Sequence, residues 1–248
     1  MGGFSAAVVA IEVRRLLRNR RTIVFTILTP VIFFFLFGLN KAYANQRIGH
    51  GNVSAFVMIS MALYGAVLST TSGGAMVSVE RLSGWSRQLR VTPLSPFAYI
   101  MIKMVTALVL GLAAVVAVYA AGIVAHKPTM PLHVWIISAL CVWLGSLLFA
   151  AFGLFIGYLL PSENVMQIVG FALMLFSFGG GLFIPLSQFS SGLQTAAKFT
   201  PLYGLNQAVH YPLAGGTFDA MWAINLLVWL AIFVVGAVWR FRRDTQRV

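Results

Sequence analysis

Acidic residues are scarce in this 248-residue chain, and none lies within a long apolar stretch. There are five, Glu12, Glu80, Glu163, Asp219 and Asp244, and each falls at or beyond the edge of an apolar run. Lys and Arg follow the same rule. Ionisable side chains deep in a bilayer usually mark proton relays, ion paths or catalytic carboxylates. The sequence therefore argues against ion coupling and against acid–base catalysis within a membrane.

Other chemical signatures are missing too. The single cysteine, Cys141, excludes an internal disulfide. No G-x-x-x-x-G-K-[ST] or H-E-x-x-H motif occurs, and the four histidines, at 50, 126, 133 and 210, lack ligand spacing. No basic soluble face with interleaved aromatics is evident. We therefore expect a chain that is not an enzyme, binds no metal, cofactor or nucleic acid, and takes its energy from another protein.

Apolar residues, in contrast, are abundant, at 60% of the chain. A helical span needs roughly 20 mostly apolar residues. Six stretches meet that length, and they predict an all-α integral membrane protein with one transmembrane domain over residues 1–248. The predicted spans are 22–39, 53–79, 104–125, 132–158, 165–185 and 219–239. Within the fourth, Gly153-x-x-x-Gly157 permits close helix crossing, and we expect it to serve internal packing.

The basic residues predict the orientation. Cytoplasmic segments of membrane proteins carry an excess of Lys and Arg. Of the 17 in this chain, 13 fall before the first span, between the second and third, or after the last. Both termini are therefore expected in the cytoplasm, and the formal charge of +12 follows from this anchoring. The sequence thus predicts a multi-pass protein of the cell membrane.

Residues 4–21 precede the first span and have two distinct faces. Helical spacing separates an apolar face from a basic one, which is typical of an interfacial amphipathic helix. The alternative is a basic flank that only sets topology. The apolar face holds Val9, Val13, Leu16 and Leu17, and the basic face holds Arg14, Arg18 and Arg21.

One substantial cytoplasmic loop is expected, over residues 80–103. Leu82, Trp85 and Leu89 have helical spacing, and Thr92-Pro93 then ends the helix because a residue before proline avoids the αR region. A short amphipathic helix with a rigid end favours a docking element over a solvated connector.

The outer segment 186–218 is longer than any other outer loop. Three glycines and Pro185 precede it and should loosen the end of the fifth span. Residues 189–199 and 205–213 are half-apolar and too short to cross a bilayer, so we expect them to fold back as a re-entrant helical segment.

The chain resembles the membrane subunits of type-two ABC exporters over nearly its whole length. Three features carry the resemblance. They are the amphipathic helix before the first span, the loop sequence Glu80-Arg81-x-x-Gly84 with Thr92-Pro93-Leu94-Ser95 and Lys103, and the run Phe178–Pro185 followed by Thr200-Pro201-Leu202-Tyr203-Gly204. A departure is His210, where the family often has Arg.

The resemblance implies a half-size permease of a bacterial plasma membrane, with membrane lipid around it. Its partners would be a second permease, identical or paralogous, and two cytoplasmic ABC ATPases that hold ATP and Mg. Coupling to the ATPase would use Glu80, Arg81, Gly84, Trp85, Arg87, Gln88 and Pro93. The translocation path would include Ser60, Tyr64, Ser69, Phe171, Met174 and Phe178, and the outer gate Gly179, Gly180, Gly181, Pro185 and Pro201.

A hydroxylated and aromatic path wall suits a hydrophobic or amphipathic cargo, such as a drug-like molecule or a lipid. The same aromatic residues are equally compatible with lipid contact or core packing. Three alternatives stay open: export of a lipid-linked glycan, a non-transporting membrane anchor or sensor subunit, and an intramembrane enzyme. The last is disfavoured by the missing carboxylates.

Overall fold

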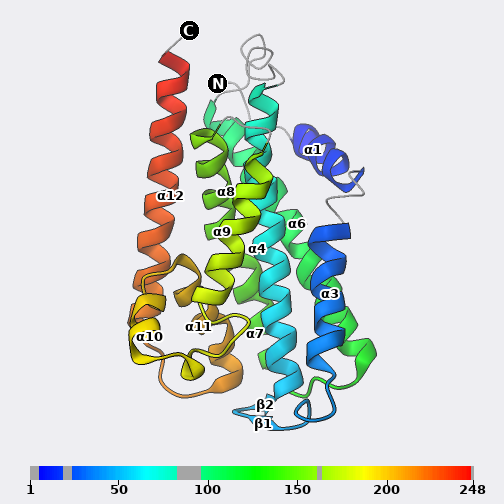
Figure 1. Ribbon diagram of the computed structural model, residues 1–248. Helices are drawn as coiled ribbons and strands as arrows, with labels where there is room; N and C mark the ends of the chain where they lie inside the picture. Colours follow the sequence, from blue (N-terminus) through cyan, green and yellow to red (C-terminus); the bar gives the residue numbers. More distant parts are fainter. Residues whose placement is uncertain (1–5, 19–23, 83–95, 161–163, 247–248) are drawn as a thin grey trace.

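The computed structural model describes residues 6–18, 24–82, 96–160 and 164–246. These residues form a bundle of long helices that run roughly side by side (Figure 1). The one described β element is a short antiparallel hairpin of β1 (Arg47–Ile48) and β2 (Gly51–Asn52). The fold is therefore mostly helical, as the composition predicts.

The first helix, α1 (Ala6–Arg18), lies across the end of the bundle, apart from the helix that follows it (Figure 1). The first apolar stretch then forms a continuous helix of three parts: η1 (Val24–Leu28), α3 (Thr29–Phe33) and η2 (Phe34–Gly38). Pro30 lacks a backbone donor, and the flanking turns are π-helical. A Cβ at Gly65 would lie 2.9 Å from Pro30 Cγ, so glycine permits this contact between α3 and the next helix.

Helix α4 (Val53–Leu82) occupies the centre, against α6 (Pro96–Ala125) and α8 (Leu147–Leu159). Small residues make the α4–α8 contact close. A Cβ at Gly153 would lie 2.2 Å from the Thr71 carbonyl oxygen, and one at Gly157 would lie 3.2 Å from that of Ala75. The expected internal role of this glycine pair is confirmed.

Helix α7 (Leu132–Gly145) leads into α8 through a short break at Ser146. After α9 (Val165–Gly179), the chain folds back through η3 (Leu186–Gln188), α10 (Ser191–Ala197) and α11 (Pro201–Ala214). Proline at the first position of α11 suits a helix start. The last helix, α12 (Ala220–Gln246), begins where Asp219 Oδ1 accepts a hydrogen bond from Met221 N–H at 2.9 Å.

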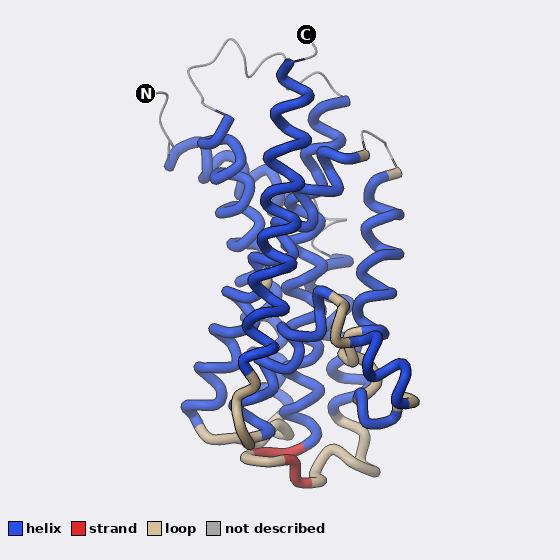
Figure 2. Tube along the Cα trace, turned by 90° about the vertical axis from the view of Figure 1, so that its left-hand side faces the viewer, coloured by secondary structure: helices blue, strands red, loops and turns tan. Residues whose placement is uncertain are grey.

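The two ends of the bundle differ. One end, here called the α1 end, holds α1, the C-terminal end of α12, the end of α4 and the start of α6 (Figures 1 and 2). The other, the hairpin end, holds β1, β2, α10 and α11. The segment 186–214 therefore gathers at the end opposite α1.

Four described helices are long and apolar enough to cross a membrane: Val53–Leu82, Ala98–Ala125, Leu132–Leu159 and Ala220–Phe241. They match the second, third, fourth and sixth predicted spans. The first and fifth correspond to shorter apolar helices, Val24–Gly38 and Val165–Gly179. A total of six spans stays a prediction.

Three helix ends differ from the sequence expectation. Helices α4 and α6 extend to Leu82 and from Pro96, so both ends of the expected 80–103 loop are helical. The fifth apolar stretch was expected to reach residue 185, but α9 ends at Gly179. There, Gly181 adopts a left-handed conformation with a φ of +78°, and Leu182 N–H donates to the Ser177 carbonyl. Together these features form a C-terminal cap that ends α9.

Candidate functional site

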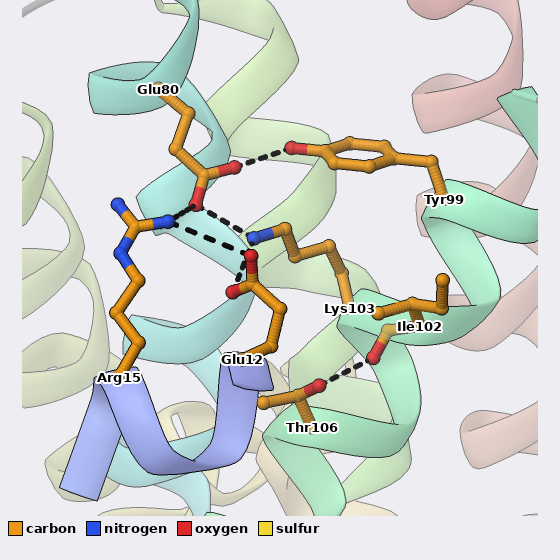
Figure 3. Close-up of polar contacts among 7 residues, drawn as sticks. All are labelled: Glu12, Arg15, Glu80, Tyr99, Ile102, Lys103 and Thr106. Atoms are coloured by element: carbon orange, nitrogen blue, oxygen red, sulfur yellow. Dashed lines mark hydrogen bonds and ion pairs between the residues drawn. The ribbon is translucent and has the colours of Figure 1, made fainter. Parts of the chain in front are cut away.

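Charged side chains from three helices meet at the α1 end (Figure 3). We call this set the charge cluster: Glu12 and Arg15 of α1, Glu80 of α4, and Tyr99 and Lys103 of α6. Lys103 lies between the two carboxylates. Its Nζ donates to Glu80 Oε1 at 2.6 Å and to Glu12 Oε2 at 3.0 Å.

The remaining contacts extend the cluster on both sides. Arg15 Nη1 donates to Glu80 Oε1 at 3.1 Å and lies 3.6 Å from Glu12 Oε1. Tyr99 Oη donates to the other Glu80 oxygen at 2.5 Å. The cluster therefore joins α1, α4 and α6 through Glu80 and Lys103, which Figure 3 shows facing one another.

Burial makes this pairing energetically important. Glu80 and Lys103 are each only 4% exposed, and Glu12 is also buried. Buried ions are tolerated when they are paired and hydrogen-bonded, but removal of one partner leaves an uncompensated charge. Within this set, each carboxylate contacts both Lys103, which is buried, and Arg15, whose side chain is about half exposed.

Sequence analysis placed Glu80 and Lys103 correctly at the borders of apolar runs but did not find their burial. Glu12 and Lys103 are 91 residues apart, and periodicity alone cannot pair them. The available signal was that opposite charges stand at the two ends of one loop. A second signal was the single acid in an otherwise basic and apolar N-terminal helix.

Arg81, another residue of the expected coupling set, contacts α8 instead. Its Nη1 donates to the Tyr158 carbonyl at 2.9 Å, and its guanidinium carbon lies 5.6 Å from the centre of the Tyr158 ring. Ser78 Oγ donates to the Leu160 carbonyl at 2.6 Å. Both contacts satisfy carbonyl groups at the end of α8 that no further helical turn can pair. Gly84, Trp85, Arg87, Gln88 and Pro93 lie outside the described residues.

The expected path residues are divided between the interior and the surface. Ser60 and Ser69 are buried within the bundle, whereas Phe171, Met174 and Phe178 on α9 are 64%, 55% and 41% exposed. Tyr64 is half-buried on α4. Between the two helices, Phe183 joins Tyr64 of α4 to Phe178 of α9, because its ring centre lies 5.1 Å from that of Tyr64 and 5.2 Å from that of Phe178.

The expected gate residues all lie near the hairpin end, where α9 meets the folded-back segment. Gly180 faces α11, since a Cβ there would lie 2.9 Å from Leu202 Cβ and 2.8 Å from the Phe176 carbonyl. Gly179 is less restricted, and its Cβ would meet Thr200 at an ordinary 3.6 Å. Pro185 immediately precedes η3, and Pro201 starts α11.

A second buried polar set, not found from the sequence, fastens α11 to α4. His210 Nδ1 lies 2.8 Å from the Asn206 carbonyl and its Nε2 lies 3.0 Å from Ser60 Oγ. Each ring nitrogen also faces a backbone carbonyl, Nδ1 that of Asn206 and Nε2 that of Phe56 at 3.3 Å, so either nitrogen of the neutral ring can donate, and Ser60 Oγ can donate to Nε2 or accept from it. Asn206 Nδ2 donates to the Gly180 carbonyl at 3.1 Å. We call Ser60, Asn206 and His210 the outer latch.

Metal binding finds no support in the part of the chain that the structure describes. No group of three or more His, Cys, Asp or Glu side chains there is arranged to hold an ion. The outer latch has a single histidine and no carboxylate among its contacts, and the carboxylates of the charge cluster are occupied by Lys103 and Arg15.

The long apolar helices define a multi-pass membrane protein. Residues 6–214 match the family model described as "ABC-2 type transporter", and the chain belongs to this family. It is also similar to the Bacillus subtilis (strain 168) protein named "Putative transport permease YvfS". The two are 25% identical over 228 residues, which cover 90% of this chain and 91% of the relative. The resemblance stated from the sequence is thereby confirmed, and family membership implies association with an ABC ATPase.

Proposed function

We propose that this chain is the permease subunit of an ATP-driven exporter that moves a hydrophobic or amphipathic compound out of the cytoplasm. The family match over residues 6–214 is the observation that carries the proposal. The cargo class rests on the exposed aromatic and Met side chains of α9, which offer an adaptable apolar wall.

The α1 end would face the cytoplasm in this proposal. Among the described Lys and Arg residues, most lie at this end, in α1, at the end of α4, near the start of α6 and in the last turns of α12, which agrees with the positive-inside tendency. ATP and Mg would be held by two partner ATPase subunits docked near residues 83–95. A second permease, identical or paralogous, would complete the path.

The burial of Glu80 makes it an unsuitable position for testing where the ATPase docks. Its carboxylate is buried in the charge cluster, so charge reversal there would disturb the bundle itself. Arg87 and Trp85 belong to the loop expected over residues 80–103, and charge reversal is therefore tested there instead. Trp85→Glu and Arg87→Glu should weaken retention of the ATPase several-fold while the permease stays in the membrane.

The experiment is co-expression of the tagged permease with candidate ABC ATPase subunits from the same genome. Co-purification and ATP hydrolysis in proteoliposomes report assembly, and ATP-dependent accumulation of an amphipathic dye in inverted vesicles reports export. A wild-type chain that retains no ATPase would overturn the permease assignment. Arg14→Glu, an exposed substitution on α1, is the matched control for charge reversal.

A further inference from the structure

Helix α1 contacts the bundle through ion pairs between charged side chains. Its one acid, Glu12, is buried toward Lys103, whereas Ile11 is 67% exposed and Arg14 and Arg18 are also exposed. This orientation directs the acid of α1 at the bundle and leaves its isoleucine on a side that the chain does not cover, where lipid can contact it. The orientation of α1 is therefore set in part by the charge cluster.

The partners of α1 lie on both sides of residues 83–95, which belong to the cytoplasmic loop expected from the sequence. Glu80 stands two residues before the last residue of α4, and Lys103 is on the second turn of α6. Lys103 bonds to Glu80 across the two ends of the loop and, through the same amine, to Glu12. A displacement of either helix end must therefore carry α1 with it or break a buried ion pair.

We propose that α1 is part of the coupling apparatus, with Glu12 and Lys103 as positioning residues that make α1 move as one unit with the loop-bearing ends of α4 and α6. This inference rests on the proposed function. Because α1 precedes the first apolar helix by only a few residues, the cluster gives the loop a second mechanical connection to the membrane part of the chain, besides α4 and α6 themselves.

The Glu12–Lys103 contact can be removed without removing the contacts of Glu80. Glu12 can be neutralised while Lys103, Tyr99 and Arg15 still contact Glu80. Glu12→Gln keeps the side-chain shape and leaves a paired Glu80–Lys103 core, so the bundle is expected to fold. Glu12→Asp keeps the charge on a shorter stem and should restore part of the function that Glu12→Gln loses.

The test uses the assembled complex of permease and ATPase in a Cys141→Ala background. Spin labels at Arg18→Cys on α1 and Leu82→Cys on α4, both exposed, report the distance between the two helices. We expect one narrow distance distribution, in nucleotide-free and in ATP–vanadate-trapped complexes alike. Glu12→Gln should broaden it, and the matched control Arg14→Gln should not.

ATP hydrolysis by the same complexes tests coupling. Glu12→Gln should keep the ATPase bound but lower its hydrolysis rate by about fivefold or more, the size of an ordinary coupling energy. An unchanged distance distribution in Glu12→Gln would overturn the proposal that Glu12 makes α1 move with α4 and α6. Normal hydrolysis with a broadened distribution would overturn the role of α1 in coupling. Failure of the wild-type complex to assemble would instead count against the proposed function.

Discussion

At the scale of residues, the buried ions of the charge cluster, Glu12, Glu80 and Lys103, are paired with one another and with the more exposed Arg15. Glu80 and Lys103 each have more than one partner, so neither charge is left alone in the apolar interior. The sequence could show that both residues border apolar runs. It could not show their depth, because burial depends on α1 returning across the bundle to supply Glu12 and Arg15.

Loss of Lys103 is predicted to be strongly destabilising. Lys103→Met removes the shared cation and leaves two buried carboxylates with Arg15 as the remaining cation of the cluster. Breaking a buried ion pair typically costs about 3–5 kcal/mol. Thermal unfolding in detergent should therefore show a large fall in Tm. Arg14→Met removes an exposed cation and should change Tm little; equal shifts in the two variants would show that burial of Lys103 contributes nothing.

The outer latch predicts a dependence on pH. Burial lowers the pKa of His210 below its ordinary value, and its described contacts, Phe56, Ser60 and Asn206, include no titratable group. The unfolded chain therefore binds this proton more readily than the folded one. The contribution of the neutral His210 to the free energy of unfolding is fully present above the ordinary histidine pKa. It is lost as the pH falls from that value toward the lower pKa of the folded chain.

The measurement is Tm in detergent at about pH 7.5 and about pH 5, on either side of the ordinary histidine pKa. The wild-type chain should lose stability at the lower pH. His210→Gln should be less stable at the higher pH but should show a smaller change between the two. A pH dependence of the same size in both would place the acid-sensitive group elsewhere.

At the scale of elements, the glycine run after α9 combines two different requirements. Gly181 has a φ of +78°, which is costly for a residue with a Cβ, and Gly180 lies too close to α11 for a side chain. Gly179 meets neither restriction. The sequence-based prediction was that all three glycines loosen the end of the fifth span. In the structure, Gly181 is required for its positive φ and Gly180 for its close contact with α11.

The three glycines are therefore predicted to differ when replaced singly. Gly179→Ala should leave Tm and dye export near the wild-type values. Gly181→Ala should cost about 1–2 kcal/mol because it forces a left-handed conformation, and Gly180→Ala should displace α11. If Gly179→Ala alone slows export without lowering Tm, flexibility at that position is part of the gate.

Element types were more predictable than their ends. Apolar length and helical spacing indicate α4, α7 with α8, and α12, because each must satisfy its backbone internally when surrounded by lipid. The ends of α4 and α6 were predicted wrongly because Glu80 and Lys103 were taken to mark the ends of the apolar helices. The two charges pair with each other, so both helices continue past them. The β1–β2 hairpin was missed because its residues form a short polar turn, whose strands pair with each other over only two residues each.

At the scale of the whole molecule, the helices differ in how much of their surface the chain itself covers. Of the most apolar window of α4, 72% is buried, against 11% for α12. Helix α9 has 15 residues, so it is about 22 Å long, shorter than the roughly 30 Å of a bilayer core. Helix α12 is therefore long enough to span a bilayer core, whereas α9 is shorter than that core.

This difference predicts where a second copy or a paralogous permease would sit. In a Cys141→Ala background, cysteines at Phe171 or Met174 of α9 should cross-link between two permeases with a short bifunctional thiol reagent. Cysteines at Leu227 or Val235 of α12, each 66% exposed, are the matched controls and should remain monomeric. Non-reducing gels of an ATP-hydrolysing complex give the measurement. Cross-links through α12 and none through α9 would place the partner on the other side of the bundle and return Phe171 and Met174 to lipid contact.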